Sequence, residues 1–251
     1  MMLYVVGSLT SLYNYVMRVE PFTVGSYVHV LKRGGRGMSI TNDNKDRSRF
    51  LRLLYYCNDT YSNEWWERET LDLGMFARPH SWPAKDSLVE ILCHTLLPNH
   101  FHLLLRETQK NGVSKFMQKV CGSMSRNFNE KYDQKGSIFQ GSYKGKLVDS
   151  DQYLRYVAMY IMVKNVFELY PKGGLEAATK NFGLAWEWAV KYPFSSLSDY
   201  VLAENLGSQT SKKASIVTKG VLGEIWETPK EFKTFARDMI EGGKWKDFEF
   251  E

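Results

Sequence analysis

The sequence predicts an α+β protein in which helices pack against an antiparallel sheet. Two apolar runs, Leu88–Leu97 and Phe101–Arg106, are separated by a Pro-Asn turn, so we expect them to pair as antiparallel strands. Apolar residues then recur at helical spacing over Val113–Phe128, which predicts an amphipathic helix. A strand, a helix, two strands and further helices therefore follow one another, an order typical of one sheet covered by helices.

The elements before these strands can be predicted from their composition. Tyr27–Leu31 is β-branched and aromatic, and it runs into a basic, glycine-rich loop, so we expect a strand there. Asn42–Asn58 begins with capping residues and carries its apolar residues on one side, which predicts a helix. Residues 59–85 hold three tryptophans with little periodicity, and we expect an irregular insertion.

The elements after the strands are mostly helical. Gly136–Val148 is punctuated by glycine and predicts a loop or a short hairpin. Polar capping residues then precede a predicted helix over Gln152–Val166. Further helices are expected over Leu175–Val190 and over Thr228–Ile240, the second with a proline in its first turn. The stretch between them, Leu206–Gly220, is polar.

Length and composition indicate a globular protein with one main domain. The chain has 251 residues, of which 43% are hydrophobic, and a formal net charge of +5. We expect a leader over residues 1–20, the main domain over 21–200 with the insertion at about 59–85, and a helical extension over 201–251. Three widely spaced cysteines form no metal-binding array, and no apolar stretch is long enough to cross a membrane, so we expect a cytoplasmic protein.

Two histidines directly after the Pro-Asn turn are the best candidates for chemistry. Side chains alternate along a strand, so His100 and His102 point the same way. Two imidazoles on one face can bind a divalent metal if a third ligand comes from elsewhere. The alternative is that both are ordinary half-buried strand histidines. His29, His80 and His94 show no partner pattern, and we expect them to be structural.

Three tyrosines on a predicted helix indicate which reaction such a metal could support. Tyr153, Tyr156 and Tyr160 are spaced by three and four residues, so they lie along one side of the predicted helix. A metal on the histidines would polarise a phosphodiester, and a tyrosine hydroxyl could then attack it to form a phosphotyrosine. Neutral imidazole suits Mn²⁺ or Zn²⁺ better than Mg²⁺. We expect the third ligand to come from the tyrosine helix.

Four ordered segments resemble one known family. Pro98–Leu104 resembles the HUH motif of single-tyrosine transposases. Phe139–Lys144 resembles a conserved segment of the REP-associated tyrosine transposase branch, and the Asp151–Ile161 helix and Tyr192–Ser196 match that branch in order and spacing. The resemblance extends from about residue 22 to residue 200.

The resemblance implies a fold, an activity and partners. It implies a ferredoxin-like HUH endonuclease core, with an antiparallel sheet and packed helices. It further implies cleavage and rejoining of single-stranded, hairpin-forming DNA through a 5′-phosphotyrosine, with Mg²⁺ or Mn²⁺ as the metal. Such a protein would be a monomer or a homodimer, with no membrane partner.

The family's site residues have counterparts in this sequence, except at the position of one metal ligand. Its metal-binding histidines correspond to His100 and His102, and its nucleophile corresponds best to Tyr160, with Tyr156 as the runner-up. The family places a polar ligand four positions after the tyrosine, where this chain has Lys164 and carries Asn165 one position later. Either a helical bulge brings Asn165 round, or the metal site is altered.

The resemblance also gives meaning to a set of basic and aromatic residues. Cations interleaved with aromatic and small residues suit a phosphate backbone and unstacked bases, although each could be an ordinary surface charge. The candidate DNA-binding residues are Lys32, Arg33, Arg36, Gln140, Tyr143, Lys144 and Lys146. The Trp65-Trp66 pair could stack on bases or form a local core.

Two other functions compete with the transposase interpretation. A hairpin-binding protein could keep the fold and lack catalysis, an alternative that Lys164 favours. A metal-dependent phosphoesterase using activated water would need carboxylate ligands, and only Glu90 and Glu107 lie near the histidines in the sequence.

Overall fold

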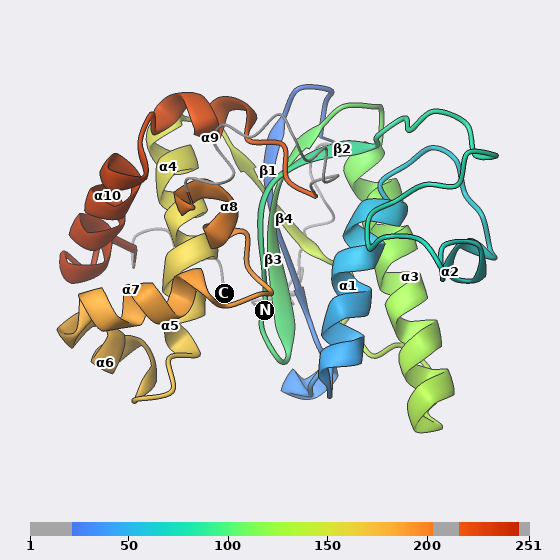
Figure 1. Cartoon of the computed structure of the whole chain (residues 1–251), viewed down its shortest axis with the longest axis horizontal. Helices are drawn as coiled ribbons and strands as arrows, with labels where there is room; N and C mark the ends of the chain where they lie inside the picture. The colour runs from blue at the N-terminus through green and yellow to red at the C-terminus, as the bar shows by residue number, and fades with distance from the viewer. Residues whose placement is uncertain (1–21, 203–215, 246–251) are drawn as a thin grey trace, which may run out of the picture.

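The computed structural model describes residues 22–202 and 216–245 as a sheet between two helical layers. Figure 1 shows the sheet edge-on, with α1 and α3 on one side and α4 to α10 on the other. The predicted leader over residues 1–20 and much of the polar stretch after residue 202 lie outside the described residues. The predicted α+β class, an antiparallel sheet with helices packed on it, is confirmed.

The sheet has four antiparallel strands in the order β2-β3-β1-β4. Their bounds are Tyr27–Arg33 for β1, Val89–Leu96 for β2, His100–Glu107 for β3 and Lys144–Val148 for β4. The pair β2–β3 confirms the hairpin predicted around the Pro-Asn turn. The prediction for Gly136–Val148 missed that its last five residues form β4, because only pairing with β1 makes this exposed segment a strand.

A bulge in β2 decides which of its side chains face the histidines. Ile91 lies opposite Leu105, but the register shifts at Leu92, so that Cys93 lies opposite Leu104. Residues directly opposite in an antiparallel pair share a face, and a shift by one residue exchanges the two faces of a strand. The bulge therefore turns Cys93 and the residues two apart from it towards the face of His102.

One face of the sheet is covered by α1 and α3. Helix α1 (Asn44–Tyr56) begins with a capping box in which Asp43 and Asp46 satisfy each other's backbone, and α3 spans Gly112–Tyr132. Fully buried apolar residues of both helices, such as Phe50 and Phe116, form one core with this face. A short 3-10 turn, η1 (Gly35–Gly37), follows β1, and the predicted irregular insertion contains one short helix, α2 (Trp66–Glu69).

The other face is covered by a longer helical series that forms the second core. Its elements are α4 (Asp151–Met159), the π turn η2 (Tyr160–Lys164), α5 (Asn165–Glu168), α6 (Gly174–Lys180), α7 (Phe182–Val190), α8 (Leu197–Val201), α9 (Gly220–Ile225) and α10 (Pro229–Glu241). The helix predicted over Thr228–Ile240 is thus confirmed as α10. None of the described helices is long and apolar enough to cross a membrane.

Two predicted helices are interrupted in the structure. The prediction of one helix over Leu175–Val190 was wrong, because the backbone of Asn181 leaves helical geometry (φ −129°, ψ 51°) and divides it into α6 and α7. The helix predicted over Gln152–Val166 contains the π turn η2 close to its C-terminal end. The break at Asn181 has a local cause, because Asn181 and Gly183 are weak helix formers, whereas the π turn contains neither glycine nor proline.

Candidate functional site

The two predicted histidines lie together on the face of the sheet that η2 covers. The rings of His100 and His102 have centroids 5.1 Å apart, and both side chains are buried. The ring of Tyr160, on η2, lies 5.5 Å from that of His102. The structure therefore brings the predicted nucleophile to the predicted metal ligands.

Hydrogen bonds orient both histidines through the same ring nitrogen. Nδ1 of His100 lies 2.7 Å from the Asn99 amide oxygen, and Nδ1 of His102 lies 2.9 Å from Nε2 of His29. An amide oxygen only accepts, so His100 carries its hydrogen on Nδ1 and its lone pair on Nε2. If His102 likewise donates from Nδ1 to Nε2 of His29, its lone pair also lies on Nε2.

His29 is the site residue that the sequence analysis missed. We expected it to be structural, but it is fully buried against His102, and its ring lies 6.0 Å from that of Tyr160. It reaches this position because β1 pairs with β3, with His29 opposite Leu104. That register depends on distant residues, so no local signal in the sequence could have placed His29 here.

The π turn changes which residue stands one turn after Tyr160. The backbone N–H of Asn165 bonds to the Tyr160 carbonyl, a spacing of five residues instead of four. Asn165 is fully buried, and neither its amide oxygen nor its amide nitrogen has a hydrogen-bond partner among the described residues. The bulge that the sequence analysis considered is therefore present, and it brings Asn165 below Tyr160.

Lys164 occupies the same turn and carries a compensated charge. It is 2% exposed, its ammonium pairs with the Glu168 carboxylate at 2.7 Å, and it lies 3.4 Å from the Tyr160 hydroxyl. The ammonium also lies over the ring of Trp245, 5.0 Å from its centroid. Lys164 is thus held by an anion and an aromatic ring at the edge of the site, and it contacts the oxygen of the candidate nucleophile.

The runner-up tyrosines point to other partners. The ring of Tyr156 packs against Phe235 of α10, and Tyr153 lies under the ammonium of Lys146. Geometry thus favours Tyr160 over Tyr156 as the nucleophile, because only Tyr160 among these three has a ring contact with the histidines that the structure records.

Three of the predicted DNA-binding cations share the histidine face. Arg33 lies directly opposite His100, Lys144 lies opposite Leu31, and Lys146 lies opposite His29. Both lysines are exposed on the edge strand β4. Since residues opposite each other share a face, these cations extend from the histidines towards the edge of the sheet.

The remaining predicted DNA-binding residues lie elsewhere. Lys32 faces the α1–α3 side and is 5% exposed. Its ammonium donates to the Gly141 carbonyl at 2.5 Å, so this side chain is buried within the protein and does not lie on the surface. Tyr143 contacts Ser114 of α3 through its hydroxyl. Arg36 and Gln140 are exposed in the loops that follow β1 and precede β4.

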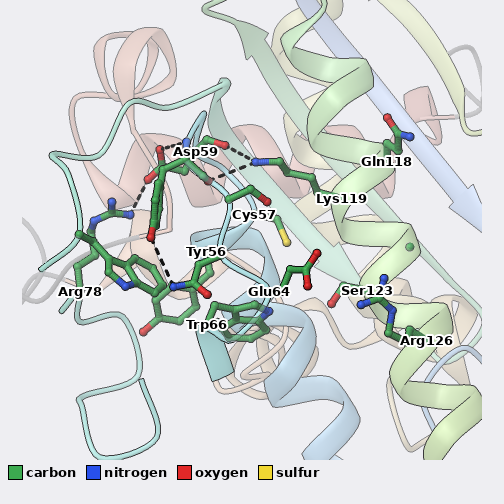
Figure 2. Close-up of a pocket in the computed structure, with 15 residues that line it drawn as sticks. Tyr56, Cys57, Asp59, Glu64, Trp66, Arg78, Gln118, Lys119, Ser123 and Arg126 are labelled. Carbon is green, nitrogen blue, oxygen red and sulfur yellow. Dashed lines mark hydrogen bonds and ion pairs between the residues drawn. The ribbon is translucent and has the colours of Figure 1, made fainter. Parts of the chain in front are cut away.

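The tryptophan pair and a separate cavity both lie in the insertion. Figure 2 shows this cavity of about 280 Å³, bounded by the insertion and α3. Its polar groups largely bind one another, since Arg78 pairs with Asp59 at 2.5 Å and Lys119 donates to the Asp59 carbonyl at 2.6 Å. Trp66 packs against a neighbouring tyrosine, whereas Trp65 is 66% exposed. The histidine site is on the opposite face of the sheet from the helix α3 that lines this cavity.

The fold and the site define a class: a four-stranded antiparallel sheet that presents two neighbouring histidines to a tyrosine on a covering helix. The sequence model of the family described as "Transposase IS200 like" matches residues 81–164, from the end of the insertion to the last residue of the π turn. The predicted resemblance to tyrosine transposases is thereby confirmed over this segment, which contains His100, His102 and Tyr160.

Comparisons with whole proteins are less informative. Among solved structures, the REP-associated tyrosine transposase bound to a REP hairpin is 16% identical, with a TM-score of 0.41, covering 79% of this chain and 95% of that one. A bacterial tRNA(His) guanylyltransferase (Thg1)-like protein in complex with ATP is 10% identical, with a TM-score of 0.37, covering 70% and 71%. Scores this low assign no function. The comparison with curated proteins gives no match.

Proposed function

We propose that the protein is a metal-dependent enzyme that cuts and rejoins single-stranded DNA through a phosphotyrosine on Tyr160. The observation that carries this proposal is the π turn, which sets Asn165 below Tyr160 on a helix that packs against the histidine pair. The match of residues 81–164 to a transposase family supports the same reaction class. The resemblance of the four sequence segments supports hairpin-forming DNA as the substrate.

The donor set fits a divalent metal. Nε2 of His100, Nε2 of His102 and the amide oxygen of Asn165 would hold it. A buried amide oxygen without a partner among the described residues is costly unless a ligand satisfies it, and two imidazole nitrogens with an amide oxygen suit Mn²⁺ better than Mg²⁺. No three His, Cys, Asp or Glu side chains in the described part of the chain form a metal-binding group, and the Asn165 amide is the proposed third ligand. The metal would neutralise charge on the phosphate oxygens.

Tyr160 would perform the chemical step. Its phenolate oxygen attacks the phosphorus in line, the new O–P bond forms, and the bond to the 3′ oxygen breaks to leave a free 3′-hydroxyl. The phenol proton passes to solvent, the departing 3′ oxygen takes up a proton from solvent, and the ammonium of Lys164, 3.4 Å from the phenol oxygen, stabilises the phenolate. The phosphotyrosine keeps a phosphodiester, so a 3′-hydroxyl can attack it and rejoin the strand.

Cations on the same face would hold the DNA backbone. Arg33, Lys144 and Lys146 share the histidine face of β1 and β4, which gives the substrate a positively charged approach to Tyr160. Lys32 is not part of this surface, because its ammonium is buried on the other side of the sheet.

A covalent-adduct assay tests the proposal. Purified protein is incubated with a labelled single-stranded hairpin oligonucleotide and Mn²⁺ and then run on a denaturing gel. We expect a protease-sensitive covalent band that disappears with a chelator and in Tyr160→Phe, whereas the matched control Tyr156→Phe keeps it.

Each other outcome contradicts a specific part of the proposal. A band that persists in Tyr160→Phe means that another residue is the nucleophile. Tight hairpin binding without any adduct identifies a catalytically silent binding protein. Cleavage that survives all three changes, Tyr153→Phe, Tyr156→Phe and Tyr160→Phe, indicates a phosphoesterase that uses water.

A further inference from the structure

Thr95 of β2 lies between the histidine pair and the π turn. It is directly opposite His102 and is fully buried. Without the bulge at Leu92, the alternation of side chains would place Thr95 on the far side of the sheet, with Ile91 and Leu105. The bulge in β2 therefore delivers one hydroxyl to the face that η2 covers.

The Thr95 hydroxyl contacts the carbonyl that the N–H of Asn165 would use in a regular α-helix. In a regular α-helix the N–H of Asn165 would bond to the carbonyl of Ile161, four residues earlier. Here that N–H bonds to Tyr160 instead, and the hydroxyl oxygen of Thr95 lies 2.5 Å from the Ile161 carbonyl oxygen. The carbonyl that Asn165 would use in α geometry thus has a hydroxyl of the sheet as a partner.

We infer that Thr95 is the positioning residue that selects the π register of Tyr160–Lys164. When the Thr95 hydroxyl bonds to the Ile161 carbonyl, the N–H of Asn165 bonds to the Tyr160 carbonyl instead. Asn165 then lies one helical turn after the tyrosine. Without the hydroxyl, the helix satisfies the same carbonyl by returning to α geometry, which places Lys164 at the position four residues after Tyr160. The consequence for metal binding rests on the proposed function, whereas the register itself does not.

The Tyr192–Ser196 segment supports Thr95 from the other side. Its backbone pairs with the outer edge of β2, through a bridge between Ser195 and Thr95 and a bond from the Ser196 N–H to the His94 carbonyl. The hydroxyl oxygens of Ser195 and Thr95 are 3.1 Å apart, and Ser195 accepts from the N–H of Leu197. The Thr95 hydroxyl has one hydrogen and three acceptors within reach, the carbonyls of Ile161 and His94 and the hydroxyl oxygen of Ser195, and the Ile161 carbonyl is the nearest of them at 2.5 Å.

This arrangement assigns a role to a sequence motif that the histidines and the tyrosine leave unexplained. The segment anchors itself on β2, where the Tyr192 hydroxyl donates to the Leu96 carbonyl at 2.7 Å. It then presents Ser195 to Thr95. A motif about thirty positions beyond the nucleophile thereby acts on the register of the helix that carries it.

Substitution of Thr95 tests the inference through two independent measurements. Thr95→Val removes the hydroxyl and keeps the branched shape, Thr95→Ser keeps the hydroxyl, and Thr41→Val is the matched control. Thr41 is also a buried threonine, but its hydroxyl has no partner among the described residues. The register is determined from crystal structures of the variants, and Mn²⁺ affinity is measured by calorimetry on the full chain.

We expect Thr95→Val to move the N–H of Asn165 to the Ile161 carbonyl and to weaken Mn²⁺ binding by about 10- to 100-fold, the usual effect of losing a group that orients a ligand. Thr95→Ser and Thr41→Val should keep the π turn and the affinity. Thr95→Cys, whose thiol is a weak donor, is the second variant and should behave like Thr95→Val.

A π turn that persists in Thr95→Val, or in Thr95→Cys if the valine variant does not fold, would overturn the inference. A merely structural role is excluded by the serine variant, because it restores the register and the affinity only if the hydroxyl matters. If the unmodified protein binds no Mn²⁺ and forms no DNA adduct, the proposed function fails, and the crystal structures still decide the register.

Discussion

Replacing the buried histidine of β2 is expected to remove much of the protein's sensitivity to acid. His94 is 3% exposed, and burial lowers its pKa from 6.5 to about 4. Its Nδ1 has no hydrogen-bond partner among the described residues, so nothing recorded there stabilises the charged ring. Between these two pH values the unfolded chain binds a proton at this position and the folded protein does not.

The size of the effect follows from the pKa. One pKa unit corresponds to about 1.4 kcal/mol, so lowering the pKa from 6.5 to about 4 corresponds to roughly 3 kcal/mol of unfolding free energy. The unfolded state gains protons as the pH falls, so this stability is lost from pH 6.5 downwards and the loss is complete near pH 4. Above pH 6.5 both states hold a neutral ring and the contribution is constant.

Urea denaturation of His94→Leu at a series of pH values measures this contribution. The variant should lose roughly 3 kcal/mol less stability than the unmodified protein between neutral pH and pH 4. Carboxylates also titrate in this range, but their effect cancels in the difference between the two proteins. His80→Leu, at an exposed histidine, is the control and should keep the original pH dependence. Equal pH dependence in His94→Leu and the unmodified protein would refute the argument that burial holds the ring neutral.

The other predictions concern two glycines of α3, a capping carboxylate and the candidate third ligand. In Gly112→Ala the new Cβ would lie 2.1 Å from a backbone carbonyl oxygen, so urea denaturation should show a free energy of unfolding lower by about 1–3 kcal/mol. In Gly122→Ala the new Cβ meets open space, so the free energy of unfolding should rise by about 0.5–1 kcal/mol. Burial raises the pKa of Asp46, but hydrogen bonds, including one from Lys131, outweigh it and the pKa lies below 3.8. Asp46→Ala should therefore cost about 1–2 kcal/mol at neutral pH, and the difference from the unmodified protein should shrink as the pH falls below 3.8. Asn165→Ala should weaken Mn²⁺ binding about tenfold or more in calorimetry while circular dichroism stays unchanged, and unaltered affinity would remove Asn165 from the ligand set.

Local patterns were sufficient for the central hairpin and for the histidine pair. Turn residues between two apolar runs specify antiparallel neighbours, and strand alternation puts His100 and His102 on one face wherever the hairpin packs. The helical spacing of apolar residues likewise predicted α1 and α3 to within a few residues. These features depend on neighbours in the sequence, and for that reason they could be predicted.

The rest of the candidate site depends on partners that are distant in the sequence. His29 reaches His102 through the pairing of β1 with β3, and Lys32 is buried because of the same register. Likewise, β4 is a strand only because β1 provides its hydrogen bonds. A register between distant strands is set by the packing of the whole sheet, so the sequence of either strand alone leaves it open.

By itself, the sequence determined the α+β class, the hairpin, the shared face of His100 and His102, and a helix that carries Tyr160 towards them. Only the tertiary structure decided that Asn165 stands below that tyrosine. The sequence pattern predicted a regular helix here, and the backbone departs from α geometry where a sheet hydroxyl contacts the Ile161 carbonyl. Helical hydrogen bonds are satisfied locally unless another group takes one partner, and here that group comes from a strand more than sixty residues away.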